Sequence, residues 1–136
     1  MKRALSWTEK LAAAKPHEVK PAPIDIAGMK AGEIMLVPSP RIVDDFIRSL
    51  PHGTAMDIPT LRKRLAAQYQ AAVTCPITMG FQLRIVAEAA CEAHAQGRVL
   101  AEITPVWRVL DETAPTMQRL GSGADFILRQ RAREGL

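Results

Sequence analysis

The chain has 136 residues, of which 48% are hydrophobic and 24% charged, a balance that suits one folded domain and excludes a long disordered chain. Its apolar runs, such as residues 34–37, are too short to cross a bilayer, and the N-terminus shows no secretory signal. We therefore expect a soluble cytoplasmic protein without membrane contact. A formal net charge of +4 permits binding to a polyanion, whereas two cysteines are too few for a disulfide framework.

The first 38 residues are predicted to form an arm and a strap packed on the domain. Ser6 and Glu9 have the spacing of a capping box, which opens a short helix that ends at Pro16. Residues 16–32 carry prolines and glycines without a helical period, so an irregular strap is expected there. Residues 34–37 are predicted to form a brief strand.

A helix is predicted from Pro40 to about Leu50, because Ser39 is a good N-cap and proline is favoured at the first helical position. Its apolar and polar residues separate onto two faces, as in a helix lying on a core. The apolar face contains Ile42, Val43, Phe46, Ile47 and Leu50, and the polar face contains Arg41, Asp44, Asp45 and Arg48.

Two further helices follow with a connection of about five residues between them. Asp57 caps a helix over residues 59–69, and a longer helix opens at Pro76 or Thr78 and ends near Gly97. The first of the two has an apolar side formed by Ile58, Leu61 and Leu65 and a basic side formed by Arg62, Lys63 and Arg64. This order predicts a helix-turn-helix.

Beyond Gly97 the pattern changes to β-branched and aromatic runs at residues 99–101 and 106–110, which predict a small hairpin or wing. A glycine-rich turn at residues 121–123 precedes a basic last helix over residues 124–133. The predicted fold is thus mainly α: a winged helix-turn-helix domain over residues 39–136, with a small β-hairpin or wing and an irregular N-terminal arm over residues 1–38.

The segment Thr104-Pro105-Val106-Trp107-Arg108-Val109 resembles an altered form of the Pro-Cys-His-Arg-Val motif of the alkylguanine-DNA alkyltransferases. Three other features occur in the order of that family's C-terminal domain. They are Pro51-His52-Gly53 before the first helix of the pair, Pro76 at the start of the second, and the stretch from Gly121 to Gly135 with its Glu-Gly ending. The resemblance covers the chain from about residue 40 onwards.

This resemblance implies a protein that binds duplex DNA through the minor groove and draws one nucleotide into a pocket beside the motif. Val106 stands in the place of the acceptor cysteine, and valine offers no thiolate, so we expect no alkyl transfer and no enzyme. Alkyltransferase-like proteins, which lack this cysteine, bind alkylated guanine and flag it for excision repair. The expected lesion pocket consists of Pro105, Val106, Trp107 and Arg108.

The DNA-contacting residues expected from the helix pair and the glycine turn are Arg62, Lys63, Arg64, Thr78, Gln82, Arg84, Ser122 and Gly123. The sequence departs from the family at two of its DNA-contacting positions. Ile58 stands in the place of the tyrosine that rotates the target phosphate, and Gly80 in the place of the intercalating arginine. Gln82 and Arg84 are the nearest polar substitutes.

Several alternatives remain open at the level of sequence. Trp107 either lines the pocket or anchors the core, whereas Arg108 is expected to brace the pocket. Residues 121–123 either admit a phosphate or form a simple turn before the last helix. Cys91 and His94 share a helix face but lack further close ligands, so neither a metal nor a cofactor is predicted. The rival function is a protein-interaction scaffold that has lost DNA contact.

Overall fold

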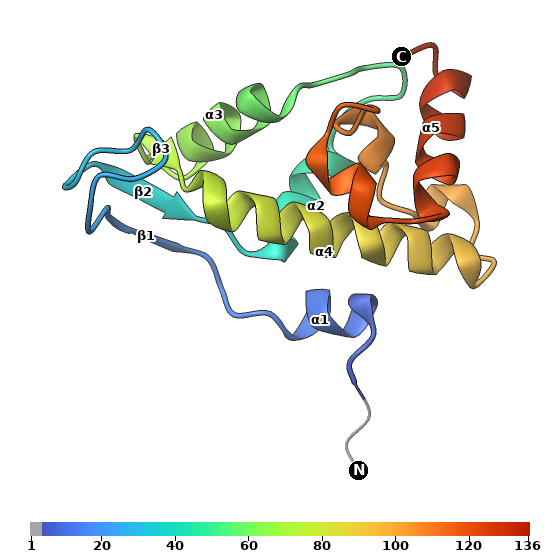
Figure 1. Cartoon of the computed structure of the whole chain (residues 1–136), viewed down its shortest axis with the longest axis horizontal. Coiled ribbons are helices and arrows are strands. Elements are labelled where there is room, and N and C mark those ends of the chain that lie inside the picture. The colour runs from blue at the N-terminus through green and yellow to red at the C-terminus, as the bar shows by residue number, and fades with distance from the viewer. Residues whose placement is uncertain (1–3) are drawn as a thin grey trace.

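Helix α4, Pro76–Ala95, is the longest element, and the other elements are arranged along it (Figure 1). The computed structural model describes residues 4–136. The remaining helices are α1 (Trp7–Ala13), α2 (Pro40–Arg48), α3 (Ile58–Gln68) and α5 (Gly123–Arg133), together with the short 3-10 helices η1 (Leu100–Glu102), η2 (Val106–Arg108) and η3 (Pro115–Arg119). The prediction of a mainly helical protein is confirmed.

The small sheet is built from the N-terminal part of the chain. Strands β1 (Glu18–Pro21), β2 (Ile34–Val37) and β3 (Val73–Thr74) lie in that order. β1 pairs with β2 antiparallel, with Glu18 opposite Val37, and β2 pairs with β3 parallel, with Met35 opposite Val73. The predicted strand at residues 34–37 is confirmed, but the strap expected to be irregular contains a strand.

The hairpin predicted after Gly97 is wrong in its location. The two β-branched runs there form η1 and η2, whose backbone bonds are local, such as Arg108 N–H to Pro105 C=O at 3.0 Å. Pro105 has no N–H to offer a sheet, and residues 103–107 are buried, so each side of this segment packs into the interior. Burial on all sides, and not strand pairing, explains the run of large apolar residues.

The predicted helix boundaries follow from capping groups that the structure contains. Ser6 Oγ accepts from Glu9 N–H at 3.1 Å, and the Glu9 carboxylate accepts from Ser6 N–H at 2.9 Å, which completes the capping box. Asp57 caps α3 by accepting from Thr60 N–H at 2.7 Å. Gly97, with φ of +80°, follows the end of α4 in the left-handed region that glycine tolerates best.

The main core lies where α2, α3, α5 and η2 meet α4, and it includes Val43, Leu61, Leu83, Val106 and Ile127. Asp44 of α2 was expected on the solvent side of the helix, and this expectation is wrong. The residue is 9% exposed, because the segment after η1 covers it. Its carboxylate accepts from Thr104 Oγ at 2.5 Å and from Arg48 Nε at 3.0 Å.

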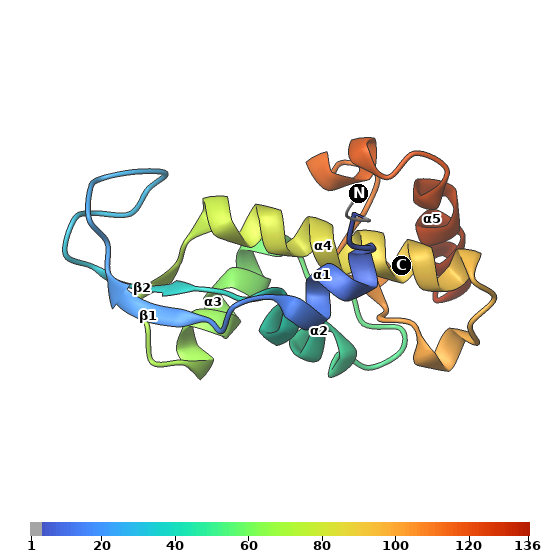
Figure 2. The same ribbon diagram turned by 90° about the horizontal axis from the view of Figure 1, so that it is seen from below.

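The N-terminal arm is attached to the helical domain at two places. α1 packs against α4, and the carboxylate of Glu92 accepts from the N–H groups of Trp7 and Thr8 at 3.1 Å each. β1 pairs with β2, and β2 pairs in turn with β3 of the domain. Seen from below, α1 and β1 lie on the same side of α4 (Figure 2).

Candidate functional site

The altered motif lies in η2, where neighbouring side chains point in different directions. Val106 is fully buried and belongs to the core, so it does not line any open surface. Trp107 is 2% exposed, and its ring meets the Phe126 ring edge-on at 5.8 Å. The Arg108 carbonyl accepts from Met56 N–H at 2.8 Å, which fixes the motif against the loop before α3.

Glu134, just after α5, is the centre of the polar network behind the motif. Its carboxylate accepts from Trp107 Nε1 at 2.5 Å, from Arg108 Nε and Nη2 at 2.8 and 2.9 Å, and from Gly53 N–H at 2.8 Å. Arg108 Nη1 also donates to Leu50 C=O at 2.7 Å. Through these hydrogen bonds Arg108 connects the motif to the residue after α5 and to the turn after α2. These are contacts of the kind expected for the predicted bracing role.

The charge state of Glu134 follows from these contacts. Burial alone raises the pKa of this carboxyl, but the hydrogen bonds from Arg108, Gly53 and Trp107 outweigh burial and lower the pKa to about 2. The carboxylate is therefore ionised at neutral pH, and the bidentate pair with Arg108 is a charge-assisted contact. A network of this kind holds the Trp107 ring in one orientation.

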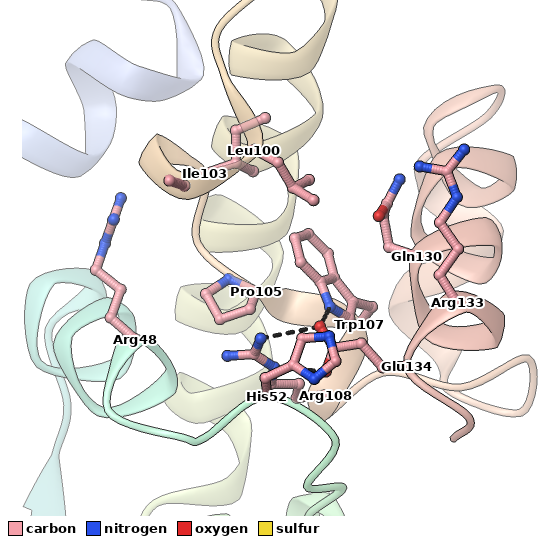
Figure 3. A pocket seen from close by; sticks show the side chains of 11 residues that line it. Arg48, His52, Leu100, Ile103, Pro105, Trp107, Arg108, Gln130, Arg133 and Glu134 are labelled. Carbon is pink, nitrogen blue, oxygen red and sulfur yellow. Dashed lines mark hydrogen bonds and ion pairs between the residues drawn. The ribbon is translucent and has the colours of Figure 1, made fainter.

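A cavity of about 520 Å³ opens beside this network (Figure 3). Its walls come from the end of α2, the turn at residues 51–53, η1, η2 and α5. Of the four residues predicted to form a lesion pocket, Pro105, Trp107 and Arg108 line this cavity and Val106 does not. Helix α4, the second helix of the predicted pair, contributes none of the lining residues.

The cavity lining offers recognition groups and no strong nucleophile. Its polar part consists of Arg48, His52, Arg108, Gln130, Arg133 and Glu134, and its apolar part of Leu100, Ala101, Ile103, Pro105 and Trp107. Both cysteines lie elsewhere: Cys75 is buried, and burial raises the pKa of Cys91 to about 11. A thiol with that pKa is almost wholly protonated at neutral pH and is a poor nucleophile.

The basic residues predicted on the first helix of the pair face solvent. Lys63 and Arg64 are exposed and Arg62 is half-buried. Within residues 4–136 none of the three forms an ion pair with a carboxylate. Their charges are therefore available to a polyanion.

The residues predicted to contact DNA from α4 make contacts within the protein, some of them inside α4 itself. Thr78 donates to Cys75 Sγ at 3.4 Å, and Gln82 Nε2 donates to Pro38 C=O at 3.0 Å. Arg84 pairs with Glu88 at 3.5 Å and lies over the Trp7 ring, 5.2 Å from its centroid. Arg84, which was predicted to contact DNA, thus lies against Trp7 of the N-terminal arm.

Ser122 is the residue before α5 and Gly123 is the first residue of that helix, in the part of the chain that packs on α4. A side chain at Gly123 would place its Cβ 2.6 Å from Cys91 Sγ, so this glycine is required by close helix packing. Figure 1 shows α3 beside the N-terminal half of α4 and α5 beside its C-terminal half. The eight predicted contact residues are consequently divided among separate regions.

Helix α4 also carries two exposed apolar side chains that were not predicted from the sequence. Ile77 and Phe81 are 45% and 67% exposed, and they line a groove of about 200 Å³ together with Arg84, Pro115 and Arg119. The spacing of Ile77 and Phe81 could have indicated this feature, because residues four apart share one face of a helix. That face differs from the buried face that contains Met79 and Leu83.

Comparison of the chain with models of protein families, with curated proteins and with solved structures gives no match. Two structural findings bear on other classes of function. Among residues 4–136, no helix has the length and apolar character needed to cross a membrane. The same part of the chain brings together no group of three His, Cys, Asp or Glu side chains suited to a metal ion. His94 instead stacks on Phe126, with ring centroids 3.8 Å apart.

Proposed function

We propose that this protein binds duplex DNA without transferring an alkyl group, as its resemblance to the alkyltransferase-like proteins implies. The observation that carries the proposal is the set of cations on α3, since Arg62, Lys63 and Arg64 form no close ion pair within residues 4–136. The nearest acidic influence is Asp57, the exposed N-cap of α3, which feels the charge of Lys63. Cations of this kind at a helix pair bind phosphates and release counterions.

The absence of transfer chemistry is supported by the position of Val106. Its side chain is fully buried, and neither cysteine is among the residues that line the cavity at the motif. On this proposal the protein acts in the cytoplasm by recognition. Alkylated guanine is the proposed lesion, and excision-repair proteins are the proposed partners.

The test is a titration of a duplex with one methylated guanine and of the same duplex unmodified, each at several salt concentrations. Each phosphate neutralised contributes about −0.9 to the slope of log affinity against log salt, so we expect a slope of about −3 for the three cations. Arg64→Glu should weaken binding at least about tenfold and reduce that slope, whereas Lys15→Glu, an equal change of charge on an exposed residue of the arm, should not.

Negligible binding to both duplexes at low salt would remove the proposal. Equal binding to both would leave a DNA-binding protein without lesion recognition. Tighter binding to the methylated duplex supports the whole proposal.

A protein-interaction domain is the second candidate, and the exposed Ile77 and Phe81 favour it. Adjacent exposed apolar side chains are typical of contact surfaces between proteins. This candidate predicts that the chain does not bind DNA and that it self-associates at high concentration through α4. Sedimentation of the wild type and of Phe81→Ser at several concentrations measures this directly.

A further inference from the structure

The groove between α4 and η3 combines an apolar side with positive charge. This α4 groove is formed by Ile77, Phe81, Arg84, Pro115 and Arg119, together with two smaller residues. Its isoleucine and phenylalanine are exposed, so the fold itself leaves them uncovered. The volume of about 200 Å³ is below the roughly 300–1,000 Å³ that is typical of small-molecule sites. A groove of this size suits a few side chains of a protein partner better than a free ligand.

Both arginines of the α4 groove keep donors that no group within residues 4–136 occupies. Arg84 Nε is buried without a hydrogen-bond partner, and Arg84 Nη2 lies 3.5 Å from Glu88, at the limit of a hydrogen bond. Arg119 is exposed and forms no close ion pair in the same part of the chain. A buried donor without a partner costs folding free energy, so the groove favours a partner that brings a carboxylate.

A surface with the complementary chemistry is present on the same chain. The loop between β1 and β2 carries Ile24, Asp25 and Ile26, and the two isoleucines are 56% and 39% exposed. Asp25 is exposed as well and forms no ion pair within residues 4–136. Figure 2 shows this loop projecting from the end of the molecule opposite α5. A carboxylate between two apolar side chains matches a groove that has two arginines beside an apolar side.

The loop is held in one shape by its own contacts. Ile26 and Met29 exchange two backbone hydrogen bonds, at 3.0 and 2.8 Å. Asp25 Oδ1 accepts from Ala31 N–H at 2.7 Å, which leaves Asp25 Oδ2 for a partner. Met29 is buried in a small core cluster with Met35 of β2. A segment that is already ordered loses little conformational entropy when it docks, so the loop is suited to insertion into a groove.

We propose that this protein self-associates, with the loop of residues 24–26 of one copy docked in the α4 groove of a second copy. Asp25 then pairs with Arg84 and Arg119, and the two isoleucines cover the apolar side of the groove. Loop and groove are different surfaces, so two copies close into a dimer when each docks its loop in the groove of the other. The contact goes beyond duplex binding by α3 and does not depend on it. It gives the second candidate function, a protein-interaction domain, a defined partner.

Sedimentation velocity at several protein concentrations measures this association. The contact is small, in the class of interfaces below about 1,200 Å², so we expect a dimer that forms in the micromolar to millimolar range. Ile24→Arg brings a cation towards the two arginines, and Arg119→Glu brings a carboxylate towards Asp25, so each should weaken association at least about tenfold. The control is Asp45→Arg on α2, an exposed residue outside both surfaces, which raises the net charge more than Ile24→Arg and should leave association unchanged.

Mixing the two variants tests whether the loop meets the groove. Ile24→Arg leaves the groove intact, and Arg119→Glu leaves the loop intact, so one unaltered contact forms in a mixed dimer. In the second contact of that dimer the two introduced charges are opposite. We therefore expect the equimolar mixture to associate at least several-fold more tightly than either variant alone. No recovery in the mixture would overturn the proposed pairing of loop and groove.

Two further outcomes would overturn the inference. A monomer at every concentration up to about 1 mM is one of them, and salt-dependent duplex binding through Arg64 would remain a separate result. The other is association that Phe81→Ser abolishes and Ile24→Arg leaves unchanged, which would assign α4 a different contact and leave the second candidate function standing. Both altered residues of the mixing test, Ile24 and Arg119, are exposed, and unchanged thermal unfolding checks that each variant is folded. Asp25→Asn adds a variant that removes the charge and keeps an acceptor for Ala31 N–H.

Discussion

Replacing Glu134 by glutamine tests whether this carboxylate holds the motif in place. The change keeps the shape of the side chain but removes the charge that four hydrogen bonds from Trp107, Arg108 and Gly53 converge on. The two side chains of the ion pair with Arg108 are only 6% and 13% exposed, so water does not readily replace the lost contact. The new amide also brings a donor where the protein needs an acceptor.

The size of the effect can be obtained in two ways. A carboxyl whose pKa falls from 4.5 to about 2 on folding contributes about 3 kcal/mol at neutral pH, since each pKa unit corresponds to about 1.4 kcal/mol. Removing one partner of a buried ion pair costs about 3–5 kcal/mol. We therefore expect Glu134→Gln to lower the free energy of unfolding by about 3 kcal/mol, or the melting temperature by about 10 °C for a chain of this length.

Urea unfolding followed by circular dichroism measures this loss, with Glu112→Gln as the control because Glu112 is exposed in a turn. Near-ultraviolet dichroism of the folded variant should also change, because Trp107 loses its hydrogen bond. A loss below about 1 kcal/mol would refute the reasoning and show that solvent or a shifted Arg108 compensates.

The same contacts give the prediction a pH dependence with a definite sign. Because the folded pKa of Glu134 is depressed, its stabilisation is fully present above the unfolded value of 4.5 and is lost as the pH falls towards about 2. The difference between wild type and Glu134→Gln should therefore be constant near neutral pH and shrink between pH 5 and 2. A difference that grows on acidification contradicts this assignment.

The remaining predictions concern packing, a buried hydrogen bond and thiol reactivity. Gly123→Ala should destabilise the protein by about 1–3 kcal/mol, because its Cβ would lie 2.6 Å from Cys91 Sγ. A Cβ at Gly80 meets no atom within 4 Å, so Gly80→Ala should be neutral or stabilise α4 by up to about 1 kcal/mol. Urea unfolding measures both changes. Thr104→Val should cost about 1–3 kcal/mol in the same assay, since it leaves the buried Asp44 carboxylate with one donor fewer. With its pKa raised to about 11, Cys91 should react with a disulfide reagent at pH 8 far more slowly in the native than in the urea-unfolded protein, and equal rates would contradict that environment.

The features that sequence predicted well depend on neighbouring residues. The capping box of Ser6 and Glu9 and the Asp57 cap need only the three residues that follow each cap, and the end of α4 before Gly97 needs a single left-handed residue. The short strand at residues 34–37 was also found, because its apolar run is bounded by Gly32 and Pro38. Such local signals are read directly from the order of residues.

Pairing between distant segments was not predictable in the same way. β1 is a strand only because β2 lies beside it, and its burial pattern, exposed throughout, contains no alternation. The run at residues 106–110 shows the reverse error, since its β-branched and aromatic residues are buried on all sides of η2 and not on one face of a sheet. A short apolar run has the same appearance in both settings.

The sequence by itself determined the helices, their caps and the basic face of α3, because each is a property of residue type or of short-range spacing. Only the tertiary structure decided that Arg84 is taken up by the N-terminal arm, that Val106 points into the core, and that Gln130 faces a cavity beside Trp107. These outcomes depend on which surfaces meet when helices pack. The direction of a side chain after packing is set by residues far away in the chain.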